Sequence, residues 1–355
     1  MKIMMTGGGT MGPVTPLIGV CEAWKKLNPW VEFVWVGTPE GPEREVLEKL
    51  GYEFISIRTA KLPRYFSVSL FSSPFVLAGS LAKAMEILKR EKPDMVMSAG
   101  GYVSVPIVWT AKLLGIKTWI HQLDVRPGLA NKLMRSFATK ITTSWESSLS
   151  SFPKDRTKWI GSPVRESLAG VDRDGVYKTL HLDPGLPTVL VLGGGVGAGW
   201  INRAMVEIGP EISIKANVIH QTGKGKDLAE LEAIGSTYHV FEFIYNMALA
   251  YAAADIVVAR AGMGTIQELA FLNKPSVLIP IPNNQQEENA IALKKSGAAF
   301  IYTQDKPVGE LDRLVTELLD RPEKRAELGR QIGLVLPTRG VAERIAKEAD
   351  EMCQK

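Results

Sequence analysis

Three glycine-rich turns in the sequence have the composition of phosphate-binding loops. They span residues 6–12, 100–102 and 193–198, and each follows a short apolar run. Glycine after a strand lets the backbone approach a ligand closely, and the helix that follows offers free N–H groups and the positive end of its dipole. A phosphate or pyrophosphate is the natural ligand, although a tight strand–helix turn without a ligand has the same composition.

The turn at residues 193–198 loosely fits the G-x-G-x-x-A pattern of dinucleotide-binding proteins. That pattern requires an Asp or Glu at the end of the next strand, where the carboxylate binds the ribose hydroxyls. Here the next apolar run, residues 217–220, leads into Gln221-Thr222-Gly223-Lys224, which contains no carboxylate. The sequence therefore argues against a dehydrogenase and favours a nucleotide bound in another way.

A carboxylate and several amides follow two later apolar runs. Thr265 and Glu268 lie where glycines open a helix, and a carboxylate on such a turn can accept from both hydroxyls of a ribose. Residues 280–289, which include Gln285 and Gln286, follow a strand end, where open α/β sheets bind ligands. Amides both donate and accept, so they suit sugar hydroxyls. A helix-start glutamate favoured by the dipole and a solvated loop are the simpler alternatives.

The elements that position these residues form two series of short, Val- and Ile-rich runs separated by helical segments. Runs that do not alternate suit parallel strands covered on both faces, and the intervening helices make βαβ units. We therefore predict an α/β protein with two doubly wound, Rossmann-like domains. The predicted strands are residues 2–5, 31–36, 53–57, 95–97, 117–121, 140–143 and 158–160, then 189–192, 217–220, 238–243, 256–259, 276–279 and 299–302.

The domain boundary is predicted near residues 161–164, because loop-like segments and a fresh strand follow. This gives domains at residues 1–162 and 163–338, and a charged C-terminal helix at 339–355 that in many proteins of this shape packs back on the first domain. The length of 355 residues suits two domains. The net charge of +4 fits phosphate-bearing ligands or anionic lipid and does not demand nucleic acid.

Several short motifs occur in a specific order along the chain. They are residues 100–106 (GYVSVP after the first glycine), 127–133 (PGLANKL), 161–165 (GSPVR), 220–225 (HQTGKG), 243–247 (FIYNM), 264–269 (GTIQEL), and Gln285-Gln286 followed by Asn289-Ala290. In this arrangement the chain resembles the bacterial UDP-N-acetylglucosamine transferases of peptidoglycan synthesis, the MurG family of glycosyltransferase family 28. The resemblance covers residues 6 to about 299 and implies a GT-B fold, with two domains facing across a cleft.

The resemblance implies an inverting transfer of N-acetylglucosamine from UDP-N-acetylglucosamine to a polyprenyl-linked acceptor. The expected acceptor is undecaprenyl-diphospho-N-acetylmuramoyl-pentapeptide, so that lipid I becomes lipid II. The expected location is cytoplasmic, peripheral on the inner face of the plasma membrane, with no nucleic-acid partner, cofactor or metal. The one Asp-x-Asp sequence, Asp172-Arg173-Asp174, reads as a solvated turn, and the four histidines lack ligand spacing.

The family also implies roles for matching residues. Arg165 would lie near the donor pyrophosphate, Ile244 would meet the uracil through its backbone, and Glu268 would hold the ribose. The other predicted donor-binding residues are Thr10, Gly12, Gly195 and Gly197 near the diphosphate, Thr265 beside Glu268, and Gln285 and Gln286 at the sugar hydroxyls. Gly9, Tyr102 and Asn131, together with Gly8, Thr10 and Gly12, would line the acceptor side.

The acceptor side departs from the family pattern. Pro13 stands where the family's first loop has a histidine, and residues 121–124 read His-Gln-Leu-Asp instead of His-Glu-Gln-Asn. The donor loop carries Gly195 where a serine is common. Because the reaction needs a base near the acceptor hydroxyl, we predict Asp124, which follows a strand end, as the catalytic base. Alternatively, Asp124 is a turn residue that caps the next helix.

Two other functions remain open at this point. A UDP-sugar 2-epimerase of the same fold would need no acceptor site, and a non-catalytic UDP-sugar-binding protein would tolerate the missing histidine. A membrane-contact segment would favour the transferase. Residues 61–77 mix aromatic, aliphatic and basic side chains, so we predict that Phe66, Leu70 and Phe71 enter the lipid interface, unless the segment packs in the core.

Overall fold

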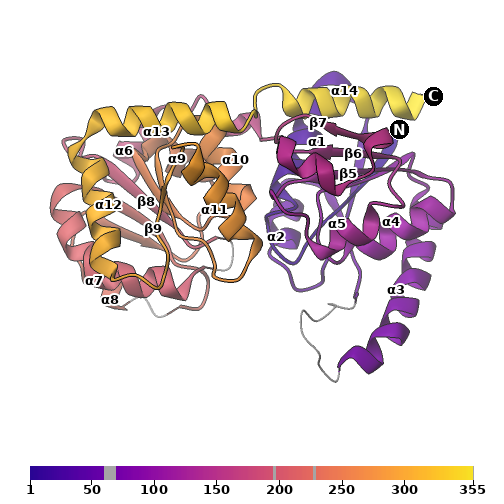
Figure 1. Cartoon of the computed structure of the whole chain (residues 1–355), viewed down its shortest axis with the longest axis horizontal. Helices are drawn as coiled ribbons and strands as arrows, with labels where there is room; N and C mark the ends of the chain where they lie inside the picture. The colour runs from indigo at the N-terminus through magenta and orange to yellow at the C-terminus, as the bar shows by residue number, and fades with distance from the viewer. Residues whose placement is uncertain (60–68, 195–196, 227–228, 355) are drawn as a thin grey trace. The chain divides into compact units, whose positions relative to one another are not determined.

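The computed structural model describes residues 1–59, 69–194, 197–226 and 229–354, with side chains from residue 78 onward in the second range (Figure 1). Two compact units make up the chain. Unit 1 contains Met1–Arg165 and Thr338–Lys355, and unit 2 contains Glu166–Pro337. Each unit has its own parallel sheet, so the predicted α/β fold class with two doubly wound domains is confirmed.

Unit 1 is built on a seven-stranded parallel sheet of order β3-β2-β1-β4-β5-β6-β7. Val34, Met4, Val96 and Ile120 come from four neighbouring strands and belong to one buried cluster, as expected for a sheet covered by helices. The strands are β1 Lys2–Thr6, β2 Glu32–Gly37, β3 Glu53–Ser56, β4 Met95–Ser98, β5 Lys117–Gln122, β6 Lys140–Thr143 and β7 Thr157–Trp159. The helices are α1 Thr15–Leu27, α2 Glu43–Lys49, α3 Ser69–Glu91, α4 Ser104–Leu113, α5 Leu129–Met134 and α14 Val341–Gln354, with 3-10 turns η1 Glu146–Ser151 and η2 Lys154–Arg156.

The last helix, α14, packs against α1, the first helix of the chain. Its apolar face, which includes Ile345 and Ala349, is buried. The indole N–H of Trp24 in α1 donates to Asp350 Oδ1 at 2.9 Å. The C-terminal segment is therefore part of unit 1, although the whole of unit 2 separates it in sequence from the rest of that unit.

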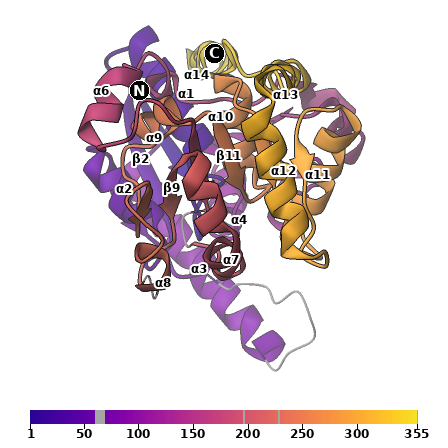
Figure 2. The ribbon, with the colours of Figure 1, turned by 90° about the vertical axis from the view of Figure 1, so that its left-hand side faces the viewer.

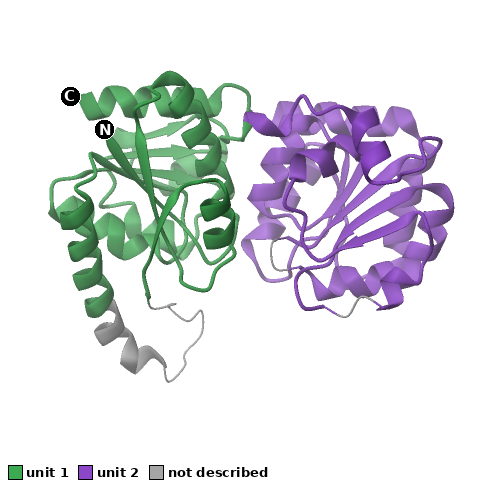
Figure 3. Ribbon diagram, turned by 180° about the vertical axis from the view of Figure 1, so that it is seen from behind, with its two compact units in different colours: residues 1–165, 338–355 green, residues 166–337 purple. Residues whose placement is uncertain are grey.

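Unit 2 has a six-stranded parallel sheet of order β10-β9-β8-β11-β12-β13. Helices α7 and α12 pack together over one face of this sheet, and α10 packs with α13, which follows α12 and also contacts it (Figure 2). The strands are β8 Thr188–Leu192, β9 Asn217–Gln221, β10 Tyr238–Phe241, β11 Ile256–Ala259, β12 Ser276–Leu278 and β13 Phe300–Ile301. The helices are η3 Glu166–Leu168, α6 Arg173–Thr179, α7 Gly199–Lys215, α8 Ala229–Glu232, α9 Met247–Ala253, α10 Met263–Leu272, α11 Gln285–Lys295, α12 Val308–Asp320 and α13 Pro322–Val335. Figure 3 distinguishes the two units by colour.

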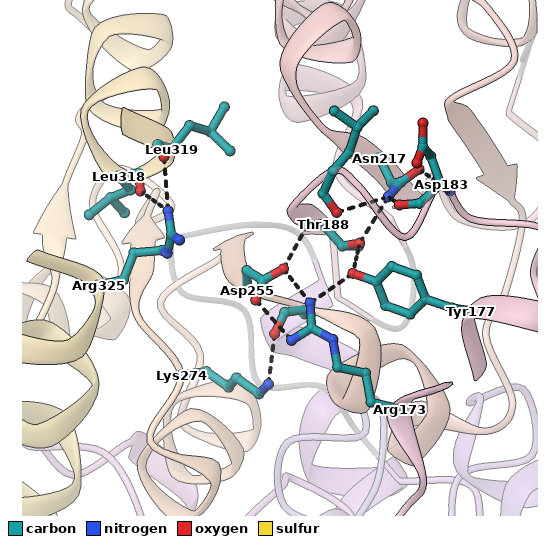
Figure 4. A network of polar contacts seen from close by, with 12 residues as sticks. Arg173, Tyr177, Asp183, Thr188, Asn217, Asp255, Lys274, Leu318, Leu319 and Arg325 are labelled. Carbon is teal, nitrogen blue, oxygen red and sulfur yellow. Dashed lines mark hydrogen bonds and ion pairs between the residues drawn. The ribbon is translucent and has the colours of Figure 1, made fainter. Parts of the chain in front are cut away.

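A polar network holds α6 to the amino-terminal ends of β8 and β11 (Figure 4). Arg173 donates to both carboxylate oxygens of Asp255, at 2.9 and 2.6 Å, and Asp255 also accepts from the backbone N–H of Thr188 at 2.8 Å. Tyr177 completes the network through the hydroxyl of Thr188 at 2.8 Å. These contacts lie at the end of the sheet opposite the glycine loops, so they secure unit 2 without occupying its loop edge. Asp172 caps α6 by accepting from the backbone N–H groups of Asp174 and Gly175, so the segment predicted as a solvated turn is instead the exposed start of this helix.

Within the described residues, no helix has both the length and the apolar composition needed to cross a bilayer. The predicted membrane-contact segment, residues 61–77, lies where the structure does not describe the side chains. Phe66 lies outside the described residues, and Leu70 and Phe71 belong to α3, in a stretch where the side chains are not described.

Candidate functional site

The predicted donor-binding residues of unit 2 follow four strands of its sheet. Gly197 follows β8, Ile244 follows β10, Thr265 and Glu268 lie in α10 after β11, and Gln285 and Gln286 open α11 after β12. Parallel strands end at the same edge, so these residues share the carboxyl-terminal edge of one sheet, where α/β folds bind ligands. Gly195, the remaining predicted donor residue of this loop, lies outside the described residues.

The loop after β8 requires glycine for two separate reasons. A Cβ on Gly197 would lie 2.1 Å from the carbonyl oxygen of Thr222, and its φ of +74° disfavours other residues. A Cβ on Gly193 would lie 2.4 Å from the backbone nitrogen of Ala198. This tight turn leads directly into α7, whose first residue is Gly199 and whose amino end carries no side-chain cap. Free N–H groups at the start of a helix of this length suit a phosphate.

Glu268 is buried in α10 and interacts with the preceding helix. Its side chain is 6% exposed, and its Oε2 accepts from the hydroxyl of Tyr251 in α9 at 2.9 Å. Tyr251 is itself fully buried. A carboxylate held in this way near the start of α10 suits a pair of ribose hydroxyls. Sequence reasoning missed Tyr251, because a tyrosine in an Ala-rich helix reads as a core residue.

The amide of Gln286 organises its own loop. Gln286 Oε1 accepts from the backbone N–H of Ile281 at 3.2 Å, and its Nε2 lies 3.5 Å from where a Cβ on Gly262 would stand. Asn284 caps α11 by accepting from the backbone N–H of Gln286. The buried Asn289 donates to the carbonyl of Ala261 at 3.2 Å. The loop after β12 is therefore tied to the turn that opens α10, which brings the predicted sugar and ribose residues together.

In unit 1, the two glycine loops after β1 and β4 pack directly on each other. A Cβ on Gly101 would lie 3.1 Å from both the backbone nitrogen and the oxygen of Gly8. A Cβ on Gly9 would lie 3.0 Å from the ring of Tyr102. Burial, assisted by Glu43 and Glu40, raises the pKa of Tyr102, so its hydroxyl keeps its proton. Two of the predicted acceptor residues, Gly9 and Tyr102, are thus in contact, while Thr10 and Gly12 lie in the same loop.

The third predicted acceptor residue, Asn131, is linked to the segment that contains Asp124. Asn131 donates to Gln122 Oε1 at 2.6 Å, and Gln122 Nε2 donates to the carbonyl of Asp124 at 2.7 Å. The Oδ1 of Asn131 faces Gly100, 3.5 Å from where a Cβ would stand. Asp124 is half-buried and does not cap α5, since Gly128 precedes that helix and no side chain caps it. The predicted base therefore lies beside the glycine loops of unit 1.

Glu43 was not found from the sequence, although it supports the first glycine loop. This fully buried residue begins α2, and its Oε1 accepts from the backbone N–H groups of Gly9 at 3.1 Å and Thr38 at 2.8 Å. A buried carboxylate is costly unless it is hydrogen-bonded, so these contacts fix both the side chain and the loop. A glutamate at the start of a helix reads as an ordinary dipole-favoured residue, and no other signal distinguished it.

Arg165 lies at the end of unit 1 and is positioned by a glycine in α1. A Cβ on Gly19 would lie 2.6 Å from the carbonyl carbon of Val164 and 2.9 Å from the backbone nitrogen of Arg165. Only glycine lets this backbone pass so close to the helix. The predicted pyrophosphate residue is thus attached to the sheet of unit 1 through α1.

Neither of the two deeply buried histidines is suited to act as a base. His121 contacts the hydroxyls of Thr142 at 2.8 Å and Ser144 at 3.0 Å, and burial lowers its pKa to about 3. His220 contacts the hydroxyl of Tyr238 at 2.8 Å, and burial likewise lowers its pKa to about 3. Both side chains are core residues of their sheets. Across the described ranges, no three or more His, Cys, Asp or Glu residues gather in a way that could hold a metal ion.

Two family models match the chain. The glycosyltransferase family 28 N-terminal domain matches residues 3–143, and the glycosyltransferase family 28 C-terminal domain matches residues 188–345. A relative from Nocardioides sp. (strain ATCC BAA-499 / JS614) is 34% identical, over 98% of this chain and 97% of its own length. It is named UDP-N-acetylglucosamine--N-acetylmuramyl-(pentapeptide) pyrophosphoryl-undecaprenol N-acetylglucosamine transferase.

Solved structures are similar over nearly the whole chain. MurG from Acinetobacter baumannii has a TM-score of 0.72 at 24% identity and covers 99% of both chains. A UDP-GlcNAc 2-epimerase from Neisseria meningitidis has the same TM-score at 13% identity, covering 99% of this chain and 100% of its own. These similarities show the GT-B fold. They do not separate a transferase from an epimerase, whereas the similarity in sequence does favour the transferase.

Proposed function

The chain belongs to the MurG family of glycosyltransferase family 28, and from this premise we propose that it transfers N-acetylglucosamine from UDP-N-acetylglucosamine to a lipid-linked acceptor. The proposed acceptor is undecaprenyl-diphospho-N-acetylmuramoyl-pentapeptide, so the product is lipid II. The observation that carries the proposal is Glu268, a buried carboxylate on the same sheet edge as the phosphate-type loop after β8. That pairing suits the ribose and diphosphate of one UDP molecule.

In the proposed reaction, an acceptor hydroxyl attacks the anomeric carbon and the bond from that carbon to the diphosphate breaks. The configuration inverts and UDP leaves. The amino end of α7 and the guanidinium of Arg165 counter the charge that develops on the diphosphate. Asp124 accepts the proton of the attacking hydroxyl. Gln285 and Gln286 bind the hydroxyls of the sugar, and the backbone of Ile244 meets the uracil.

The acceptor side is proposed to use the paired glycine loops of unit 1. We assign Gly9, Tyr102 and Asn131 to the acceptor, and Thr10 and Gly12 to the donor. Pro13 replaces a histidine of the family pattern, and Asp124 is the carboxylate that follows β5 in this region. A polyprenyl-linked acceptor also implies that the protein works at the inner face of the plasma membrane, as a peripheral cytoplasmic protein.

One experiment separates the transferase from its alternatives. The purified protein is incubated with UDP-N-acetylglucosamine, with and without a polyprenyl-diphospho-N-acetylmuramoyl-pentapeptide acceptor, and UDP and sugar products are measured. We expect UDP release only with the acceptor. Formation of a manno-configured sugar would instead identify an epimerase, and binding without turnover would identify a non-catalytic UDP-sugar-binding protein. The Glu268→Ala variant serves as the matched control, because it should weaken donor binding while keeping the fold.

A further inference from the structure

Gln221 connects the two loops that we assign to the phosphates and to the base of the donor. It is the last residue of β9, the strand between β8 and β10, and its side chain is only 4% exposed. Its Nε2 donates to the carbonyl of Gly194, in the loop after β8, at 3.1 Å. Its Oε1 accepts from the backbone N–H of Ile244, in the loop after β10, at 2.9 Å. One buried amide thus bridges two loops that come from non-adjacent strands.

The polarity of these two contacts explains why an amide is required. Gly194 presents a carbonyl, which needs a donor, and Ile244 presents an N–H, which needs an acceptor. A primary amide supplies both within one planar group, whereas a carboxylate could not donate to Gly194 and an apolar side chain could pair with neither backbone group. The carbonyl of Gly194 also accepts from the N–H of Gly197 at 3.0 Å, so the same carbonyl links Gln221 to the end of the phosphate-type turn at Gly197.

Other contacts hold the base loop to the segment after β9, since the N–H groups of Thr222 and Gly223 donate to the carbonyls of Phe241 and Glu242, whereas Gln221 contacts both loops at once. Gly194 has a φ of +82°, and among the described residues no atom beyond its chain neighbours lies within 4 Å of the point where its Cβ would stand. On the other side, the tyrosine that follows Ile244 is 55% exposed. A glycine loop with open space beside it depends on hydrogen bonds rather than on side-chain packing for its position.

We propose that Gln221 is a positioning residue that sets the distance between the phosphate loop and the base loop, so that a nucleoside diphosphate spans both at once. This inference rests on the proposed donor site and deepens it. A ligand that bridges two loops gains from their fixed spacing, because it does not have to restrain one loop relative to the other when it binds. A ligand that touches one loop alone gains nothing from that spacing.

The test compares one spanning ligand with two that cannot span. Dissociation constants of UDP, uridine and pyrophosphate are measured for the unaltered chain and for Gln221→Met, which removes both hydrogen bonds at similar volume and without adding charge. We expect UDP to bind about 10-fold more weakly, equivalent to about 1.4 kcal/mol. The product of the fold-changes for uridine and pyrophosphate should stay below about 3-fold. The larger loss for UDP then indicates coupling between the two loops. A change for UDP no larger than that product would overturn the proposal.

Two further variants make the result specific. Gln304→Met removes a comparable amide, which donates to the carbonyl of Pro280 at 3.0 Å in another loop, and should leave UDP binding unchanged. If thermal unfolding shows that Gln221→Met is not folded, Gln221→Asn keeps a neutral amide that is one methylene shorter. Gln221→Asn should show the same excess loss of UDP affinity. If it shows no such excess, the proposal is overturned.

Failure of this inference is distinguishable from failure of the proposed function. The coupling is measured by binding, so a chain that binds UDP but transfers no sugar would refute the transferase and leave the role of Gln221 intact. Normal transfer by Gln221→Met, together with losses that simply multiply, would refute the role of Gln221 and leave the transferase intact. A chain that binds no UDP at all would refute both.

Discussion

The hydroxyl of Tyr251 lies 2.9 Å from Oε2 of Glu268, and both side chains are buried. Tyr251 belongs to α9 and Glu268 to α10, so the contact joins the helices that follow β10 and β11. A carboxylate that binds two ribose hydroxyls must present its oxygens in a fixed orientation. In the proposed donor site the tyrosine hydroxyl fixes one of these oxygens, so we expect Tyr251 to affect how well Glu268 binds a ribose.

The Tyr251→Phe variant should therefore weaken UDP binding without unfolding the protein. Loss of one neutral donor to the carboxylate should cost about 0.5–1.5 kcal/mol of binding free energy, and Glu268→Ala should cost about 1.5–3 kcal/mol. Calorimetric titration with UDP measures both. In the double variant, the tyrosine change should have no further effect, because it acts through the carboxylate. Independent, additive losses would show that Tyr251 does not act through Glu268.

The Gln286→Ala variant should distinguish the sugar from the nucleotide. Its amide is predicted to meet the N-acetylglucosamine, so the KM for UDP-N-acetylglucosamine should rise while the affinity for UDP alone stays nearly unchanged. Steady-state kinetics and UDP titration make the comparison. Because Gln286 Oε1 also accepts from the N–H of Ile281, the change removes a contact within the loop as well. An equal fall in UDP affinity would assign the amide to the shape of the loop and not to the sugar.

Much of the fold was predictable because its signals are local. The buried strands β8 and β11 are short Val-rich runs whose composition alone identifies them, and all thirteen observed strands overlap a predicted one. The resemblance to glycosyltransferase family 28 is confirmed by both family models. Glu268 could be proposed because glycines precede it on a helix, a pattern with a clear chemical meaning.

The supporting residues could not be predicted, because their partners are distant in sequence. Glu43 meets Gly9 across 34 positions, and Gln221 meets Gly194 and Ile244 across 27 and 23. Nothing in the neighbouring residues indicates such contacts, since they arise only when parallel strands align their carboxyl ends. Gly19 could not be predicted for the same reason, because only the fold brings the backbone of Val164 into contact with it.

The Asp124→Asn variant tests the assignment of the base. Removing a general base should lower turnover by about 100-fold or more, with donor binding intact. Turnover is measured with the lipid acceptor at saturating donor, and UDP binding is the control. His121 is an unsuitable alternative, because burial lowers its pKa to about 3 and both ring nitrogens contact hydroxyls. Near-normal turnover of Asp124→Asn would remove this residue from the mechanism.

The Gly19→Ala variant tests how Arg165 is positioned. The added methyl group would lie 2.6 Å from the carbonyl carbon of Val164, so the backbone at Arg165 must move. We expect lower kcat/KM for the UDP-sugar, together with a fall in melting temperature. Gly79→Ala is the matched control, because Gly79 also lies within a helix but, apart from that helix's own backbone, no described atom lies within 4 Å of its Cβ position. That change should be neutral or slightly stabilising. Equal effects of the two variants would contradict the proposed role of Gly19.

The two buried histidines, one in each unit, should make the folded protein less stable in acid. Burial lowers the pKa of His121 and of His220 to about 3, whereas an unfolded chain titrates histidine near its ordinary value of about 6.5. Between these values the unfolded state binds a proton that the folded state does not, so stability falls as the pH falls through this window. Each histidine should contribute a slope of about 1.4 kcal/mol per pH unit once the pH is well below 6.5.

Urea unfolding of the unaltered chain, His121→Gln and His220→Gln between pH 7 and pH 4 measures this slope. Each variant should be less stable at pH 7 but should lose less stability on acidification than the unaltered chain. Parallel pH profiles would show that these histidines do not govern the response to acid.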